Sequence, residues 1–303
     1  MGTTHAQVQA EGRIEVFQTD DGLELCCARW GQPQRGSVIL LHGGGQTRHA
    51  WGNSAARLAA AGWEALALDL RGHGDSQWSP SGDYALSRMA RDVEGIARTL
   101  TRRPVLVGAS MGGMTALYAL GRMNPDLAHA LVLVDVVPRM EGSGVRRIVQ
   151  FMQAHPAGFA TLEEAADAVA AYRRDTRERP ADLAGLRKNL RQRADGRWYW
   201  HWDPQMLQPR NPQAMADYMG LFDAARAIQV PTLLVRGQRS DVVSTKGVAE
   251  FLDMVPHAEF VDVAGAGHMV AGDNNDAFSA AIVDFLERHL QPTLPLQGRE
   301  GSA

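Results

Sequence analysis

One serine, held between a predicted strand and a predicted helix, constrains this chain more than any other feature. The stretch 104–120 reads PVLVGASMGGMTALYAL: a short β-branched run, a glycine-rich turn with Ser110 at its apex, then apolar and small residues at helical spacing. Strand, sharp turn and helix around G-x-S-x-G is the context of a nucleophile elbow. Small neighbours let strand and helix approach a strained serine, and the amide of Met111 would point to where an oxyanion forms. The alternative is a plain turn in which Ser110 only caps the helix.

The composition is that of an ordinary globular protein, and it excludes several classes of partner. Of the 303 residues, 45% are hydrophobic and 21% charged. The net charge of -3 lacks the positive excess that is typical of proteins that bind nucleic acid or an anionic membrane. No run approaches the ~18 apolar residues of a membrane span, and the first residues lack the apolar core of a signal peptide.

The cysteines and histidines indicate which cellular compartment to expect and whether to expect a metal site. Cys26 and Cys27 are adjacent, so a disulfide framework is absent and a reducing cytoplasm is the expected location. No Cys/His cluster has the spacing of a zinc site. We therefore expect neither a metal nor a cofactor.

Apolar runs alternate with helical patterns along the chain. This alternation, with strands buried on both faces, predicts an α/β fold with a mostly parallel sheet and helices on both sides. The first two strands are expected to form a hairpin at the Asp20-Asp21-Gly22 turn. The expected strands are 13–19, 23–30, 37–41, 63–70, 105–107, 127–136, 228–237 and 257–263, and the expected helices include 51–61, 84–100, 243–254 and 274–290.

The residue pattern of the sequence changes after Pro138. From there to about residue 226 the strand signal is lost, and the segment is rich in alanine and arginine and reads as helical. We predict a first core part at 1–137, a helical insertion at 138–226, a second core part at 227–290 and a disordered tail at 291–303.

A nucleophilic serine needs a base and a third group that orients the base. With an elbow the chain order is serine, acid, histidine. His268 suits the base, since it follows the last predicted strand in a loop of small residues. Asp135 and Asp241 both follow strands in the right part of the chain. We favour Asp241, because the short loop 236–240 could swing its carboxylate back toward the sheet edge.

The glycines of His42-Gly-Gly-Gly45 follow a buried strand directly and would leave backbone amides free to bind a substrate oxygen. We assign the second oxyanion amide, beside that of Met111, to Gly44, with its two neighbours as alternatives. His42, His73 and Asp75 are expected to brace loops rather than to catalyse.

The aromatic run 198–202 permits two interpretations. Alternation would place Trp198, Trp200 and Trp202 on one side, toward either the insertion's own core or a substrate pocket. We retain them as candidate substrate-binding residues. The arginines of 173–193, interleaved with acids, are expected to form a solvated helical face rather than a patch for acidic substrates.

From about residue 12 to 290 the chain resembles the α/β-hydrolase family. Four motifs agree in order: 42–45, 69–76, the elbow at Ser110, and Asp241 with His268. The resemblance implies an eight-stranded-type sheet, a helical cap after the sixth strand, a Ser110–His268–Asp241 triad, and oxyanion amides from Gly44 and Met111. Serine at the elbow argues against the family's dehalogenases and epoxide hydrolases, which use aspartate there.

The resulting hypothesis is a cytoplasmic serine hydrolase that cleaves a carboxylic ester or lactone with an apolar body. Carbon–carbon bond hydrolysis and cofactor-free haloperoxidase or perhydrolase chemistry by the same triad remain alternatives, as does a small-molecule binding module without turnover. The expected partner is a small-molecule substrate; monomer and homodimer are both open.

Overall fold

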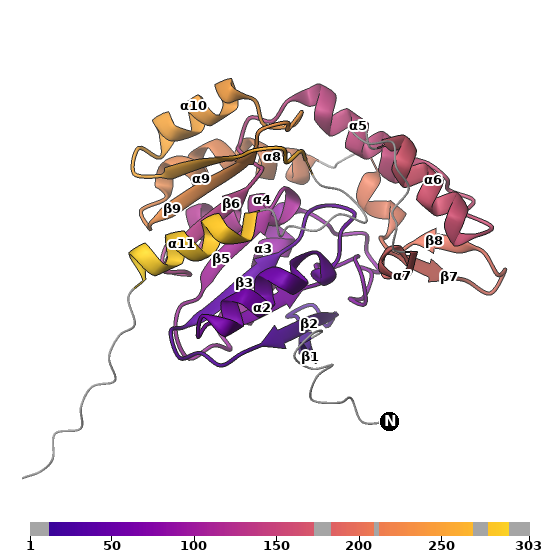
Figure 1. Ribbon diagram of the computed structural model, residues 1–303, viewed down its shortest axis with the longest axis horizontal. Helices are drawn as coiled ribbons and strands as arrows, with labels where there is room; N and C mark the ends of the chain where they lie inside the picture. The colour runs from indigo at the N-terminus through magenta and orange to yellow at the C-terminus, as the bar shows by residue number, and fades with distance from the viewer. Residues whose placement is uncertain (1–11, 173–182, 209–211, 269–277, 291–303) are drawn as a thin grey trace, which may run out of the picture.

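An eight-stranded sheet runs through the centre of the molecule (Figure 1). The structure is a computed structural model that describes residues 12–172, 183–208, 212–268 and 278–290. The strand order is β1-β2-β4-β3-β5-β6-β9-β10; the β1–β2 and β2–β4 pairs are antiparallel and the others parallel. All eight expected strands of the sheet are confirmed, with ends shifted by a few residues. They are β1 (Arg13–Gln18), β2 (Glu24–Trp30), β3 (Ser37–Leu41), β4 (Glu64–Leu68), β5 (Val105–Ala109), β6 (Ala130–Val134), β9 (Thr232–Gly237) and β10 (Glu259–Val263).

The strands β2 to β6 and β9 contribute side chains to two cores, because successive side chains point to opposite faces of a sheet. In β3, Val38 and Leu40 join the core covered by α2 and α11, whereas Ile39 and Leu41 join the core covered by α3, α4, α9 and α10. The strands β3 to β6 are buried along their whole length, which explains their continuous apolar runs. The elements outside the sheet are η1 (Arg48–Trp51), α2 (Gly52–Ala60), α3 (Leu86–Ala97), α4 (Met111–Tyr118), η2 (Ala119–Met123), α9 (Leu221–Ala227), α10 (Thr245–Met254) and α11 (Ser279–His289).

The segment 138–226 lies between β6 and β9, and it is not purely helical. A two-stranded hairpin, β7 with β8, forms inside it, and Phe159 bridges to Trp198 at its side. The expectation of a helical insertion without strands is wrong here. Two signals in the sequence were available: the β-prone alternation Trp-Tyr-Trp, and the turn dipeptide Asp195-Gly196, where Gly196 has φ +78°.

The insertion has a hydrophobic core of its own, built around Phe151, Phe159 and Trp200. Its last helix, α9, instead packs into the larger core under the sheet. The limits of the insertion as a separate folding unit stay a prediction. Its elements before α9 are α5 (Gly142–Gln153), α6 (Leu162–Tyr172), α7 (Leu183–Arg187), β7 (Leu190–Gln192), β8 (Trp198–Trp200), η3 (Pro204–Leu207) and α8 (Pro212–Met219).

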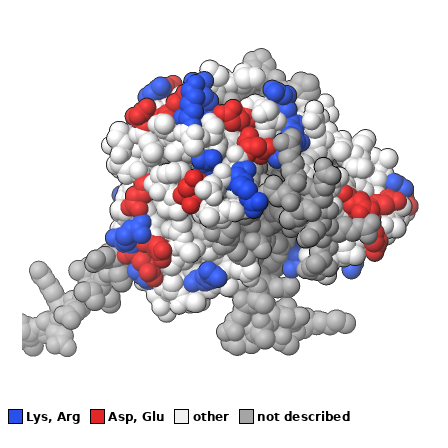
Figure 2. Space-filling view, turned by 45° about the horizontal axis from the view of Figure 1, so that its top comes forward, with Lys and Arg blue, Asp and Glu red and all other residues white. Residues whose placement is uncertain are grey.

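The surface carries both signs of charge. On the face shown in Figure 2, acidic and basic side chains are interspersed. Within the described ranges, no helix is both long and apolar enough to cross a bilayer. The expected helix start at 274 and the expected tail 291–303 lie outside the described residues.

Two glycines provide a matched test of the packing between sheet and helix. A Cβ on Gly112 would lie 2.5 Å from the carbonyl oxygen of Leu41, whereas a Cβ on Gly95, exposed on α3, would meet nothing within 4 Å. We expect Gly112→Ala to lower the free energy of unfolding by more than about 3 kcal/mol, since a backbone segment must move. Gly95→Ala should raise it by about 0.5–1 kcal/mol through helix propensity. Urea unfolding of both variants measures this; equal stabilities would contradict the close approach.

Candidate active site

Ser110 occupies a strained turn between β5 and α4. Its φ is +46°, in the region that residues with a side chain rarely adopt, and its amide donates to the carbonyl of Val134 across the sheet. A Cβ on Gly108 would lie 2.5 Å from the backbone of Gly112, and one on Gly113 would collide with Val136. The flanking glycines are therefore required sterically, and the elbow geometry expected from the sequence is present.

His268 lies against Asp135. Its Nδ1 is 2.6 Å from Asp135 Oδ2, and the two side chains are only 3% and 5% exposed. Asp135 directly follows β6 and has φ +50°. Because Ala109 of β5 pairs with Val134 of β6, Ser110 and Asp135 leave neighbouring strands at the same level. Ser110 and His268 both line one cavity at this edge.

The Asp135 carboxylate is held by two further donors. The Gly237 amide donates to Oδ1 at 3.1 Å, and the Ser240 hydroxyl donates to Oδ2 at 2.7 Å. Together these two bonds fix the direction of the carboxylate. Ser240 is a site residue that the sequence analysis missed.

The favoured acid, Asp241, does not contact His268 in this structure. Its carboxylate, 32% exposed, forms an ion pair with Arg147 of α5 at 2.6 Å, and its backbone packs against Gly144. The loop 236–240 does return to the sheet edge, as expected, but it delivers Ser240, and Asp241 lies one residue beyond. The preference for Asp241 is corrected to Asp135, which needs no loop because β6 ends beside β5.

The glycine loop after β3 leaves one amide available. The Gly43 amide donates to Gln46 Oε1 at 3.0 Å, and the Gly45 amide donates to His73 Nε2 at 3.3 Å. Within the described residues, the amides of Gly44 and Met111 have no hydrogen-bond partner. Both residues line the cavity beside Ser110, so this arrangement can bind an oxygen that becomes negatively charged there.

Three buried histidines lie behind this loop. The ring centroids of His42 and His73 are 4.9 Å apart, and those of His73 and His201 are 5.6 Å apart. His42 Nε2 accepts from the Leu70 amide at 3.0 Å, and its Nδ1 is 2.8 Å from the Gly43 carbonyl. These contacts agree with the expectation that His42 and His73 brace loops. His201 was missed, although alternation places it opposite Trp200 and Trp202.

Burial keeps these rings neutral. It lowers the pKa of His42 to about 4 and that of His73 to about 3, and it lowers the pKa of His201 well below the usual value. The positive charge of Arg48 also lowers the pKa of His42, and that of Arg191 also lowers the pKa of His201. The negative charge of Asp69 acts in the opposite direction on the pKa of His73.

The cavity at Ser110 has a volume of about 700 Å³ and a wall rich in thioethers. Six of the chain's 12 methionines line it, and methionine is a flexible side chain that adapts to varied apolar ligands. Val145, Ile148 and Val149 of α5 form another part of the wall. The six methionines are Met89, Met111, Met114, Met140, Met152 and Met206.

The candidate substrate-binding tryptophans lie elsewhere. Trp200 and Trp202 are buried and stacked, with ring centroids 4.9 Å apart, and Trp198 packs on the same core. None of the three is among the described residues that line the cavity. Their expected role as pocket residues is corrected to packing inside the insertion, where three large rings can exclude water together.

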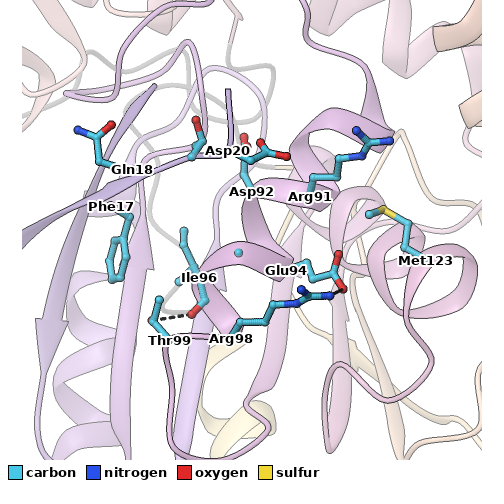
Figure 3. Close-up of a pocket in the computed structure, with 12 residues that line it drawn as sticks. Phe17, Gln18, Asp20, Arg91, Asp92, Glu94, Ile96, Arg98, Thr99 and Met123 are labelled. Atoms are coloured by element: carbon cyan, nitrogen blue, oxygen red, sulfur yellow. Dashed lines mark hydrogen bonds and ion pairs between the residues drawn. The ribbon is translucent and has the colours of Figure 1, made fainter. Parts of the chain in front are cut away.

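A second cavity, of about 370 Å³, lies between β1 and α3 (Figure 3). Four of the five charged residues at its wall are paired: Arg98 pairs with Glu94, and Asp20 and Asp92 pair with Arg88. Its described lining contains none of the candidate catalytic residues.

Two clusters of acidic residues, one with a cysteine, have ligand atoms close enough together to hold a metal ion. Asp69 and Asp75 approach Cys26, and Asp20 and Asp21 approach Asp92. The first pair is engaged by Arg48, and the second cluster by Arg71 and Arg88. In both clusters arginine supplies the positive charge, so these are ion-pair networks. The arginines of 173–182 lie outside the described residues, and Arg191 pairs with Asp75 at 2.6 Å.

Comparison with known proteins agrees with the fold of this chain. A model described as the alpha/beta hydrolase family matches residues 38–281. The chain is 33% identical over 296 residues to the esterase Rv0045c of Mycobacterium tuberculosis, covering 93% of this chain and 92% of that protein. It is 30% identical over 251 residues to the 3-hydroxybutyrate-oligomer hydrolase of Cupriavidus necator, with coverages of 79% and 85%. A crystal structure of an alpha/beta hydrolase from Novosphingobium aromaticivorans superposes with a TM-score of 0.75 at 28% identity, covering 92% of this chain and 99% of that one.

The neutral histidines predict a stability that falls in weak acid. Unfolding would release His42, His73 and His201 to pKa values near 6.5, so the unfolded chain binds more protons below that pH. We expect the free energy of unfolding to be constant above about pH 7 and to fall as the pH drops toward 4, by up to about 1.4 kcal/mol per pH unit for each histidine. Urea unfolding at pH 7.5, 6.5 and 5.5 measures the slope. His201→Gln removes one of the three titrating rings, so it should reduce the slope by the contribution of about one proton. A free energy of unfolding that does not change with pH would contradict the burial of neutral histidines.

Proposed function

Because the chain belongs to the alpha/beta hydrolase family, we propose that it is a serine hydrolase that cleaves a carboxylic ester or lactone through an acyl-enzyme. The observation that carries the proposal is the arrangement at the carboxyl edge of the sheet. Ser110 sits at a strained apex, His268 is bonded to Asp135, and two unpartnered amides share the cavity with them. The two named relatives, an esterase and a 3-hydroxybutyrate-oligomer hydrolase, support the choice of reaction.

The proposed reaction has two steps at one carbon. Ser110 Oγ attacks the acyl carbon while His268 Nε2 takes the hydroxyl proton, and the same proton then goes to the leaving alcohol. A water activated by His268 attacks the acyl-enzyme and releases the acid. Asp135 keeps the imidazole Nδ1 protonated and stabilises the imidazolium that forms. The amides of Gly44 and Met111 stabilise the negative oxygen of both tetrahedral intermediates.

The cavity favours a flexible apolar substrate chain. Thioether side chains can adopt several shapes at low cost, so one wall can accept chains of different length. The volume of about 700 Å³ lies within the range of pockets for small and medium-sized ligands. We propose that segment 138–226 acts as a cap that supplies much of this wall through α5. We also propose a cytoplasmic location, since Cys26 and Cys27 are both free thiols.

The first test combines the nucleophile with the substrate class. A panel of p-nitrophenyl esters from acetate to decanoate should be hydrolysed, with the medium chains among the better substrates because they fill the methionine-lined cavity. Ser110→Ala should lower kcat by about 10⁶, since the covalent step is lost. A fluorophosphonate should add to Ser110, as peptide mass would show. A folded protein that neither labels nor hydrolyses any ester would support a binding module instead.

The second test distinguishes the two aspartates. Asp135→Asn should lower kcat by about 10⁴, because an amide cannot hold the required imidazole tautomer. Asp241→Asn should retain kcat within about tenfold, since it removes only a partly exposed ion pair with Arg147. Both variants are compared on the same ester after circular dichroism has shown that they are folded. The reverse ranking would overturn the assignment of Asp135.

A further inference from the structure

The geometry points to His201, a residue of the insertion, as a positioning residue for the oxyanion loop. This loop is the glycine segment 43–46 after β3, which carries the Gly44 amide, and His201 contacts it from the side of the insertion. The inference rests on the proposed function, because it assigns the Gly44 amide to the oxyanion site. It adds a coupling between the insertion and the catalytic edge of the sheet that neither the motif pattern nor the family resemblance contains.

Gly45 is held on both sides by imidazoles from different parts of the chain. Its amide donates to His73 Nε2 at 3.3 Å, and its carbonyl lies 3.3 Å from His201 Nε2. Its φ of +78° is a conformation that glycine adopts without strain. With Gly45 held in this way and the Gly43 amide bound to Gln46, the peptide that carries the Gly44 amide has little freedom to rotate.

The hydrogen bonds determine the tautomer of each ring. His201 Nδ1 accepts from the Gly74 amide at 2.7 Å, so the proton of the neutral ring is on Nε2, which donates to the Gly45 carbonyl. His73 has the opposite tautomer, because its Nε2 accepts from Gly45 and its Nδ1 faces the Arg71 carbonyl at 3.3 Å. Both rings are fully used by backbone groups, which is possible only while they are neutral.

The residues next to His201 attach the insertion to the same loops. The Asp203 amide donates to the Gly72 carbonyl at 2.9 Å, and the Tyr84 hydroxyl donates to Asp203 Oδ2 at 2.5 Å. Trp202 reaches the oxyanion loop, since a Cβ on Gly45 would lie 3.4 Å from its ring. The insertion is therefore anchored at this end, and a shift of residues 201–203 would be transmitted to Gly45.

Two conservative substitutions separate the two bonds of His201. Glutamine can place a donor near the position of Nε2 and preserve the bond to Gly45, whereas asparagine can place an acceptor near the position of Nδ1 and preserve only the bond to Gly74. If His201 positions the oxyanion loop, His201→Asn is the damaging change. If it serves only to secure the loop 71–76, His201→Gln is the damaging one.

The first readout does not require turnover. Hydrogen exchange measured by mass spectrometry should be faster across the peptide containing 43–46 in His201→Asn than in the wild type, and close to wild type in His201→Gln. The surface variant His257→Asn, which also loses a bond to a backbone carbonyl, serves as control. Equal exchange across 43–46 in the wild type and His201→Asn overturns the inference, whether or not the protein hydrolyses esters.

The second readout is kinetic. His201→Asn should lower kcat on the preferred ester about 10- to 100-fold with KM changed less than threefold, because a misplaced oxyanion donor acts mainly on the transition state. A trifluoromethyl ketone, which mimics the tetrahedral intermediate, should bind more weakly by a similar factor. His201→Gln should restore kcat to within about fivefold of wild type. A larger loss in His201→Gln than in His201→Asn, or a loss confined to thermal stability, overturns the assignment. Absence of esterase activity in the wild type would instead contradict the proposed function and leave the exchange result to decide the positioning role.

Discussion

The register between β5 and β6 is the constraint on which the rest of the site depends. Ala109 pairs with Val134, so the next residues, Ser110 and Asp135, leave the sheet together. Both have positive φ, and both keep a cross-strand hydrogen bond: the Ser110 amide to Val134 and the Asp135 amide to Val235 at 2.7 Å. The ladder thus holds two strained residues side by side, and a slip of one residue would turn every neighbouring side chain to the other face.

The loops above that edge are held by buried polar groups rather than by apolar packing. Asp69 accepts from the amides of Arg48 and Asp75 and pairs with the Arg48 guanidinium, and Arg71 is fully buried against Asp92. The buried charges are paired, and the histidines of the cluster are neutral and saturated by backbone groups. Such groups are costly to expose singly, so they fix loop positions closely. This network therefore fixes the geometry of the glycine loop at residues 43–45.

Most features whose signal is local could be predicted from the sequence. The elbow around Ser110, the eight strands of the sheet and the loop carrying His268 follow from hydrophobic period, glycine placement and chain order. The sequence left Gly43 and Gly45 as alternatives to Gly44, and the hydrogen bonds made by the amides of these two neighbours favour Gly44. The hairpin β7–β8 was missed although its turn and alternation were legible, because a segment rich in alanine and arginine suggested helix throughout.

Local sequence patterns identify which residues can react and where most strands and helices lie, since these depend on neighbours a few positions apart. The contacts between these residues depend on the tertiary structure. Asp135 faces His268 because β6 is adjacent to β5, while a loop ending one residue early gives Ser240 to that carboxylate and Asp241 to Arg147. The tryptophans likewise pack on one another, and methionines from separate elements form the cavity. Such contacts depend on distances of a few ångströms between remote segments, and no local pattern encodes them.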